Sequence, residues 1–243
     1  MSGGYSMPTN ETQRLEMPLL QPAQAQKHVT VNEALMRLDG LVNLTLQSVA
    51  TAIPPSQVID GQCWGVPANP SGAWAGQSGR IAIGSNGGWV FVPAGPGMRA
   101  FIVDHGICAI HDGTRWVNGA VTLGQSGAGL LTGIAEANVS VSSGAVFDTG
   151  LTIPAGVMVI GATARVTQAL TGSLSSWRLG NLGADDRFGQ GLGKSMDSWA
   201  RGLLGSPMAY YDDANLLMTA EGGQFSGGRI KLAVHWLELR LPD

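Results

Sequence analysis

The sequence predicts a mainly β protein with an N-terminal helix, a small β-hairpin module and a C-terminal antiparallel β-sandwich of the jelly-roll type. The chain of 243 residues contains 36 Gly, and short apolar runs separate its glycine-rich turns, which is typical of many short strands. Only one stretch, after a capping-box pattern, has strong helical periodicity. Two long segments near the C-terminus alternate apolar and polar residues, as half-buried strands do.

The N-terminal part combines a polar arm with the expected helix. Residues 1–30 are predicted to be an attachment arm, since they are polar and carry few charges near the helix. Thr30 offers an N-cap oxygen and Glu33 completes the capping box of a helix over 31–50. Apolar residues then recur at a/d spacing, at Leu35, Leu38, Val42 and Val49.

This apolar stripe allows two interpretations. The helix packs on its own domain, or it forms a short parallel bundle between subunits. We favour the bundle, because the stripe is wide and the flanking sequence is rich in proline and polar residues.

Residues 57–118 are predicted to form the small β module. Asn86-Gly-Gly and Asp112-Gly-Thr are hairpin turns, and each is closely followed by a tryptophan. Trp89 and Trp116 are interpreted as packing anchors. The expected strands are 62–66, 80–83, 89–92, 100–103, 107–110 and 116–117.

Residues 119–144 are predicted to be a linker because they are mainly Gly, Ser and Ala. The C-terminal domain is placed at 145–243. Its strands are expected at 145–148, 157–167, 177–179, 208–211, 216–220 and 229–239, with the clearest alternation in 157–167 and 229–239.

Composition argues against several classes of function. The net charge is −3 and the Lys and Arg residues are scattered singly, so no nucleic-acid partner is expected. No segment is apolar enough to cross a bilayer and no secretory signal is present, so we expect synthesis in a cytoplasm and no membrane insertion. Cys63 and Cys108 could pair or remain free.

No catalytic or metal signature is found, and the sequence predicts neither an enzyme nor a cofactor. The glycine-rich segment 189–195 lacks the first glycine of a phosphate-binding loop, where Phe188 stands. In an extended segment Cys108 points to the face opposite that of His105 and His111, which argues against a metal site formed by the three. Two opposed carboxylates, which a polysaccharide depolymerase needs, are not established by sequence, and that class stays open.

Aromatic and polar residues gather in the C-terminal domain in a pattern typical of sugar recognition, in which aromatic faces and fixed polar groups act together. The alternative for each aromatic residue is a place in the core or at a subunit interface. The candidate carbohydrate-binding residues are Trp177, Arg178, Asp185, Asp186, Arg187, Trp199, Tyr210 and Tyr211, with Arg201 nearby.

Segment 17–35, MPLLQPAQAQKHVTVNEAL, resembles the opening signature of an alphaproteobacterial family of prophage and gene-transfer-agent proteins. Segments 72–76, 79–82 and 86–91 are similar to the β module that follows in that family. Segments 152–156, 165–167, 188–189 and 222–230 resemble its terminal domain.

The resemblance implies a homotrimeric fibre or spike on the surface of a phage-like particle. A tail fibre is the first expectation, held to a baseplate protein and binding bacterial surface polysaccharide; a head spike held to a capsid protein is the alternative. Read with the resemblance, the polar segment 21–34 is the expected attachment point. Its candidate residues are Gln21, Gln24, Gln26, His28 and Asn32.

Overall fold

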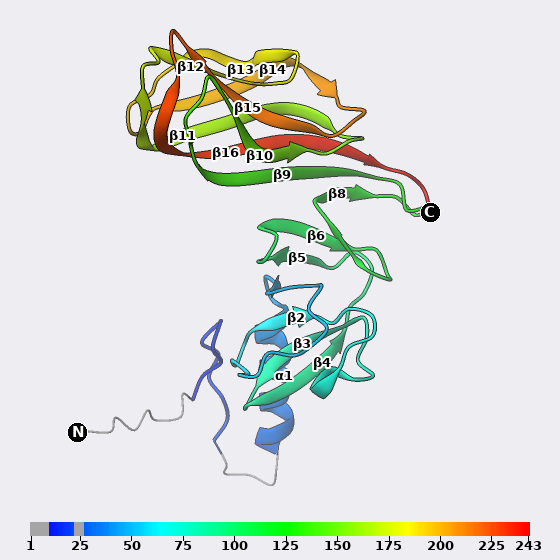
Figure 1. Cartoon of the computed structure of the whole chain (residues 1–243). Coiled ribbons are helices and arrows are strands. Elements are labelled where there is room, and N and C mark those ends of the chain that lie inside the picture. Colours follow the sequence, from blue (N-terminus) through cyan, green and yellow to red (C-terminus); the bar gives the residue numbers. More distant parts are fainter. Residues whose placement is uncertain (1–9, 22–26) are drawn as a thin grey trace, which may run out of the picture. The chain divides into compact units, whose positions relative to one another are not determined.

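The computed structural model describes residues 10–21 and 27–243. The chain divides into two compact units, with the division after Ala120 (Figure 1). Strands are the main regular elements of both units, and the described residues contain a single α-helix, α1 (Lys27–Leu41). The prediction of a mainly β protein with one N-terminal helix is confirmed.

The predicted bounds of the helix are wrong at both ends. Helix α1 starts at Lys27, so Thr30 lies inside it rather than at its N-cap, and Glu33 pairs with Arg37 at 2.6 Å. After Leu41 the chain turns through Asn43, whose φ of 47° is left-handed. Residues 44–46 then enter the sheet, because their leucines are buried in its core.

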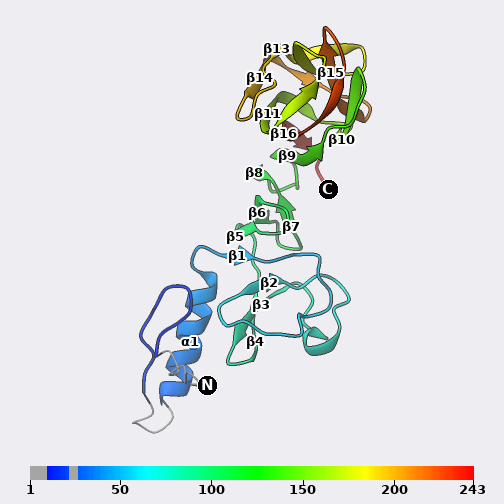
Figure 2. The same ribbon diagram turned by 60° about the vertical axis from the view of Figure 1, so that its left-hand side comes forward.

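The part of the predicted arm that the structure describes is bound to α1. Asp39 is fully buried near the C-terminus of the helix. Its carboxylate accepts hydrogen bonds from the Thr12 hydroxyl (2.7 Å) and from the backbone N–H groups of Arg14 (3.2 Å) and Leu15 (2.7 Å). Both views of the chain show residues 10–20 alongside the helix (Figure 2).

Arg14 completes this attachment by capping the helix. Its guanidinium donates to the carbonyls of Asp39 (2.7 Å), Gly40 (2.9 Å) and Asn43 (2.8 Å). The last carbonyls of a helix have no partner within the helix, and a cation there also interacts favourably with the helix dipole. Residues 10–20 are therefore part of the folded first unit.

The first unit contains one seven-stranded sheet in the order β4-β3-β2-β1-β5-β6-β7. The short central strand β1 pairs in parallel with β2 and β5, and the outer pairs are antiparallel hairpins. Asn86 and Gly87 both have positive φ, as the predicted hairpin turn requires. The strands are β1 (Thr45–Leu46), β2 (Cys63–Gly65), β3 (Arg80–Ser85), β4 (Gly88–Pro93), β5 (Arg99–Ile102), β6 (Ile107–His111) and β7 (Trp116–Asn118), with a 3-10 turn, η1, at Gly72–Trp74.

Two clusters of apolar side chains form the core of this unit. One centres on Leu46, Ile83 and Ile102. In the other, Trp74 is fully buried, with its ring centroid 5.9 Å from that of Trp64 and 5.1 Å from that of Trp89. The second cluster confirms that Trp89 acts as a packing anchor.

The second unit contains two sheets that share one hydrophobic core. The four-stranded sheet has the order β10-β15-β12-β13, and the five-stranded sheet has the order β14-β11-β16-β9-β8. Their strands are β8 (Ala120–Leu123), β9 (Gly129–Ser140), β10 (Val146–Ile153), β11 (Met158–Gly172), β12 (Ser176–Asn181), β13 (Ala184–Leu192), β14 (Trp199–Ala209), β15 (Ala214–Glu221) and β16 (Phe225–Arg240).

The predicted linker over 119–144 is wrong, because β8 and β9 occupy much of it. Strand β9 pairs with β16 continuously from Gly129 to Ser140. Its core-facing residues include Gly133, Ala135 and Ala137, which carry little apolar surface and so gave a weak signal. Small residues are needed there: a side chain on Gly133 would collide with the indole of Trp236.

Candidate functional site

Strand pairing brings a row of cationic and aromatic side chains together on the outer face of the five-stranded sheet. Arg165 in β11 pairs with Trp199 in β14 on one side and with Lys231 in β16 on the other. Directly paired residues on neighbouring strands point to the same face of a sheet. The neighbouring row on this face comprises Arg201, Thr163, Ala233 and Glu136.

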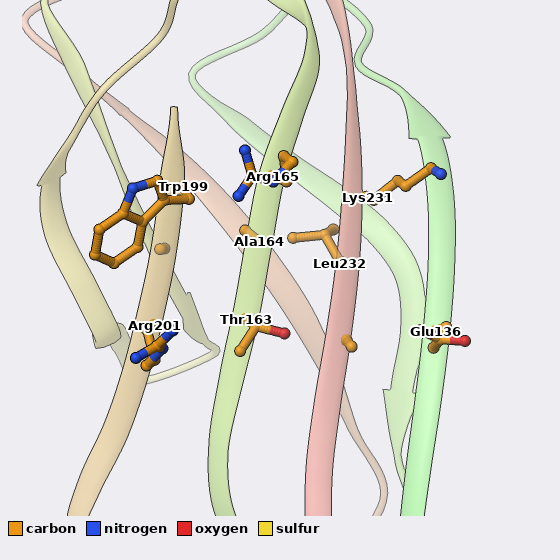
Figure 3. A pocket seen from close by; sticks show the side chains of 10 residues that line it. Glu136, Thr163, Ala164, Arg165, Trp199, Arg201, Lys231 and Leu232 are labelled. Atoms are coloured by element: carbon orange, nitrogen blue, oxygen red, sulfur yellow. The ribbon is translucent and has the colours of Figure 1, made fainter. Parts of the chain in front are cut away.

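These two rows surround a shallow hollow of about 270 Å³. Trp199 is 63% exposed, which is unusual for so large an apolar side chain. Figure 3 shows Trp199 and Arg201 on β14, with the labelled residues of β11 and β16 next to them and Glu136 beyond. The intervening residues Ala164 and Leu232 turn inward and belong to the core.

The hollow has an excess of positive charge. Arg165, Arg201 and Lys231 are all exposed, and none of them takes part in an ion pair within the described part of the chain. The Arg201 guanidinium lies 5.8 Å from the centroid of the Trp199 ring. Glu136 is the one acidic side chain among the residues that line the hollow.

Two of the predicted sugar-binding residues are buried, and their prediction is therefore wrong. Trp177 is 1% exposed and its indole N–H donates to the carbonyl of Gly193 at 2.9 Å. Tyr210 is 7% exposed, and burial raises the pKa of its phenol. Both side chains fill the core between the two sheets, because their apolar rings are worth more buried than exposed.

Arg178 and Asp185 form an ion pair of their own on the four-stranded sheet, at 2.9 Å. Arg178 also lies 3.4 Å from Glu221, whose pKa is lowered by the hydrogen bond from the Ser176 hydroxyl and, to a smaller degree, by a backbone N–H and Arg178. Arg178 and Asp185 do not line the hollow.

The remaining predicted residues do not join the hollow either. The Arg187 guanidinium donates to the Asn181 side chain at 2.8 Å and contacts the sulfur of Met208. Asp186 is exposed, and Tyr211 is 87% exposed in the turn after β14. Of the predicted group, only Trp199 lines the hollow, with the nearby Arg201.

Sequence reasoning missed Arg165, Lys231, Thr163 and Glu136 as members of this site. Arg165 and Lys231 occupy outward positions in the two strands whose alternation was clearest, so the sequence indicated only that each side chain faces away from the core. Their proximity depends on the pairing of β11 with β16, which the sequence does not specify.

The predicted attachment residues have different surroundings. Gln24 and Gln26 lie outside the described residues, and Gln21 is exposed. The Asn32 side chain accepts from the Leu20 N–H (2.9 Å) and donates to the Leu20 carbonyl (3.0 Å), so it fastens the arm to α1. The Nδ1 atom of His28 is buried and has no hydrogen-bond partner among the residues that the structure describes.

The candidates for metal or disulfide chemistry in the first unit are separate from one another. Cys63 is a buried free thiol and Cys108 an exposed one. His111 is buried and packs edge-on against Trp116, with ring centroids 5.0 Å apart. The described residues contain no group of three or more His, Cys, Asp or Glu placed to hold a metal ion. None of their helices has the length and apolar character to cross a membrane.

Residues 31–117 match the sequence profile of a family described as "Protein of unknown function (DUF2793)". The match covers most of α1 and most of the first unit. No protein of curated function matches the chain significantly.

Among solved structures, the chain is similar to one described as "Cyanophage Pam1 capsid asymmetric unit". The identity is 17%, the TM-score is 0.34, and the match covers 44% of this chain and 84% of that one. A TM-score at this level carries no inference about fold or function.

Proposed function

We propose that the chain is an adhesin on the surface of a phage-like particle, and that the outer face of its five-stranded sheet binds bacterial surface polysaccharide. The observation that carries the proposal is Trp199, which remains 63% exposed on a sheet face lined with cations. An exposed aromatic ring with polar groups fixed around it is the arrangement that stacks on a sugar ring and hydrogen-bonds its hydroxyls.

The N-terminal signature supports the placement on a particle. Its resemblance to prophage and gene-transfer-agent proteins favours a fibre or spike on the particle surface, and we take a tail fibre as the first candidate. In this proposal residues 10–21 and α1 form the attachment end, and the second unit, taken as a β-sandwich, is the receptor-binding domain. We expect binding without cleavage of the polysaccharide.

The helix supports a trimeric assembly. Val31, Leu38 and Val42 are exposed on one side of α1 and its C-terminal end, with Leu35 partly exposed between them. Their spacing is that of a coiled-coil seam, and a trimer would cover them. Three copies of a weak sugar site would then act together, which raises the overall affinity without any new contact.

Binding to cells tests the adhesin role. Fluorescently labelled protein should bind encapsulated host cells and should bind capsule-deficient cells at least tenfold less. Trp199→Ala should reduce binding to encapsulated cells by about tenfold. A nucleobase stacked on one aromatic side chain contributes on the order of 1–3 kcal/mol, and we expect the lower part of this range for a sugar ring. Full binding by Trp199→Ala would count against this face.

Tyr211→Ala is the matched control, since it removes an exposed aromatic ring outside the hollow and should leave binding unchanged. Immunogold labelling of intact particles decides their location. Gold at the tail tip supports a tail fibre, and gold on the head supports the head-spike alternative.

A further inference from the structure

We propose that the hollow around Trp199 selects an acidic polysaccharide, with one sugar ring stacked on Trp199 and a neighbouring ring carboxylate held by Arg165 and Lys231. This rests on the proposed function and adds the chemical class of the ligand. No residue pattern in the sequence pointed to it, since the three cations come from different strands.

The hollow is positively charged although the chain as a whole is negatively charged. The whole chain has 14 Lys and Arg against 17 Asp and Glu, so acidic residues are in excess. Even so, Arg165, Arg201 and Lys231 gather at one hollow with a single carboxylate, Glu136. Arg165 and Lys231 are directly paired, and such positions are ~4.5–5.5 Å apart, so these two cations repel each other unless an anion lies between them.

The cations of the hollow make few interactions with the described part of the chain. Elsewhere in the described residues, Arg14 caps a helix and Arg178 pairs with two carboxylates. Among the residues that the structure describes, Arg165 makes one long hydrogen bond, at 3.3 Å, to the carbonyl of Asp197, and no ion pair involves Arg165 or Lys231. Their charge is therefore available to a ligand.

The geometry fits a carboxylate beside a ring. Arg165 stands between Trp199 and Lys231 in the pairing, so a group that it binds lies next to the indole. Its planar guanidinium can hold both oxygens of a carboxylate, while Lys231 adds a point charge. Arg201 covers part of the Trp199 ring, but 63% of that side chain is still open to a sugar.

A nucleic acid is the less favoured polyanion. Proteins that bind duplex DNA through its backbone typically contact ~6–10 phosphates. The hollow offers three cations on a protein of net negative charge, which is too few for that mode. Uronate-bearing polysaccharide is the occupant to which we commit.

The test uses isothermal titration calorimetry on the full chain. The probes are hyaluronan octasaccharide, a uronate polymer fragment, and maltooctaose, a neutral oligosaccharide of equal length. We expect hyaluronan octasaccharide to bind at least tenfold more tightly than maltooctaose, and its affinity to fall about tenfold between 50 and 500 mM NaCl.

Charge-neutralising variants locate the effect. Arg165→Gln and Lys231→Gln should each weaken hyaluronan binding about fivefold, and the double variant more than either. Binding of maltooctaose should be unchanged. Arg80→Gln, which removes an exposed cation from the first unit, should leave both affinities unchanged. These are exposed side chains on a paired sheet, so circular dichroism and the melting temperature should match those of the wild type.

Each other outcome has a distinct meaning. Equal binding of both oligosaccharides, unaffected by Arg165→Gln and Lys231→Gln, overturns the acidic preference while leaving the adhesin proposal in place. Binding of neither oligosaccharide, together with loss of any difference between encapsulated and capsule-deficient cells, overturns both. Equally tight binding of a dT16 oligonucleotide would reveal a general polyanion surface and also overturn the selectivity.

Discussion

Asp39 is the residue on which the order of the N-terminal segment depends. A fully buried carboxylate is costly unless its oxygens are hydrogen-bonded, and here three donors from residues 12–15 reach it. We expect Asp39→Asn to lower the free energy of unfolding by about 2–3 kcal/mol, because it removes the charge from three hydrogen bonds and turns one acceptor into a donor. Urea unfolding measures this loss.

Hydrogen exchange identifies where the effect of Asp39→Asn arises. The amides of Arg14 and Leu15 should lose protection, since the carboxylate is their acceptor. Glu33→Gln is the control on the same helix: it breaks only the exposed pair with Arg37 and should cost less than about 0.5 kcal/mol. Unchanged protection in Asp39→Asn would mean that the segment is held by other contacts.

The stability of the first unit should fall at alkaline pH because of the buried thiol of Cys63. Burial raises the pKa of its thiol to about 11 from an ordinary value of 9.0, Asp39 adds to the rise, and Arg14 opposes it. In the unfolded chain the thiol ionises from about pH 9, whereas in the folded chain it stays protonated. The stability that the neutral thiol provides is therefore complete below pH 9 and is lost as the pH rises through 11.

Urea unfolding between pH 8 and pH 11 measures this loss. Wild type should lose on the order of 2 kcal/mol more than Cys63→Ala over that interval, since the variant has no thiol to ionise. Cys108→Ala removes an exposed thiol and should keep the wild-type slope. Identical slopes for wild type and Cys63→Ala would contradict the assignment.

At the scale of elements, α1 has two faces with different environments. Met36 and Gly40 face the first unit, where Gly40 packs closely on Ile83 and Cys63. The stripe through Leu38 is exposed. If this stripe is the trimer seam, Leu38→Lys should convert trimers to monomers, because a charge at a seam position opposes close packing.

Light scattering coupled to size-exclusion chromatography measures the mass of the Leu38→Lys variant. Far-ultraviolet circular dichroism should stay unchanged, since Leu38 supports no core of its own subunit. Thr30→Lys, at an exposed position on another side of the same helix, should leave the trimer intact. A monomeric wild type would remove the trimer from the proposal.

The elements that the sequence predicted correctly are those with a local signal in their own residues. The hairpins of the first unit have turn residues with positive φ, as at Asn86 and Gly87, and flanking apolar runs, both of which are local signals. Strand β16 has strong alternation, and its alternate residues Ile230, Leu232 and Val234 are buried. Such elements can be recognised without knowing their partners.

The missed elements depend on partners far away in the chain. Strand β9 has a glycine at Gly133 because the indole of Trp236 lies against it, and β1 consists of two residues that belong to the predicted helix but pair with β2 and β5. The hollow around Trp199 was missed for the same reason, since its cations meet only when β11, β14 and β16 pair. Long-range pairing of this kind leaves no local pattern.

At the scale of the molecule, the arm and the fold of the first unit cannot be separated by a simple truncation. Deleting residues 1–30 removes Thr12, Arg14 and Leu15 together with every predicted attachment residue except Asn32. The deletion would leave the Asp39 carboxylate without these donors, so loss of particle attachment would have two causes. Substitutions at the exposed Gln21 address attachment without disturbing Asp39.

The second unit, by contrast, should fold and bind glycan without the first unit. Its two sheets enclose a core of their own, in which Trp177, Phe225 and Met218 are almost completely buried. We expect a fragment that begins at Gly119, just before β8, to fold cooperatively and to bind hyaluronan octasaccharide with the one-site affinity of the full chain, because every residue lining the hollow lies within it. A sigmoidal urea transition and calorimetric titration measure the two properties. A folded fragment without affinity would contradict the placement of the whole site in the second unit.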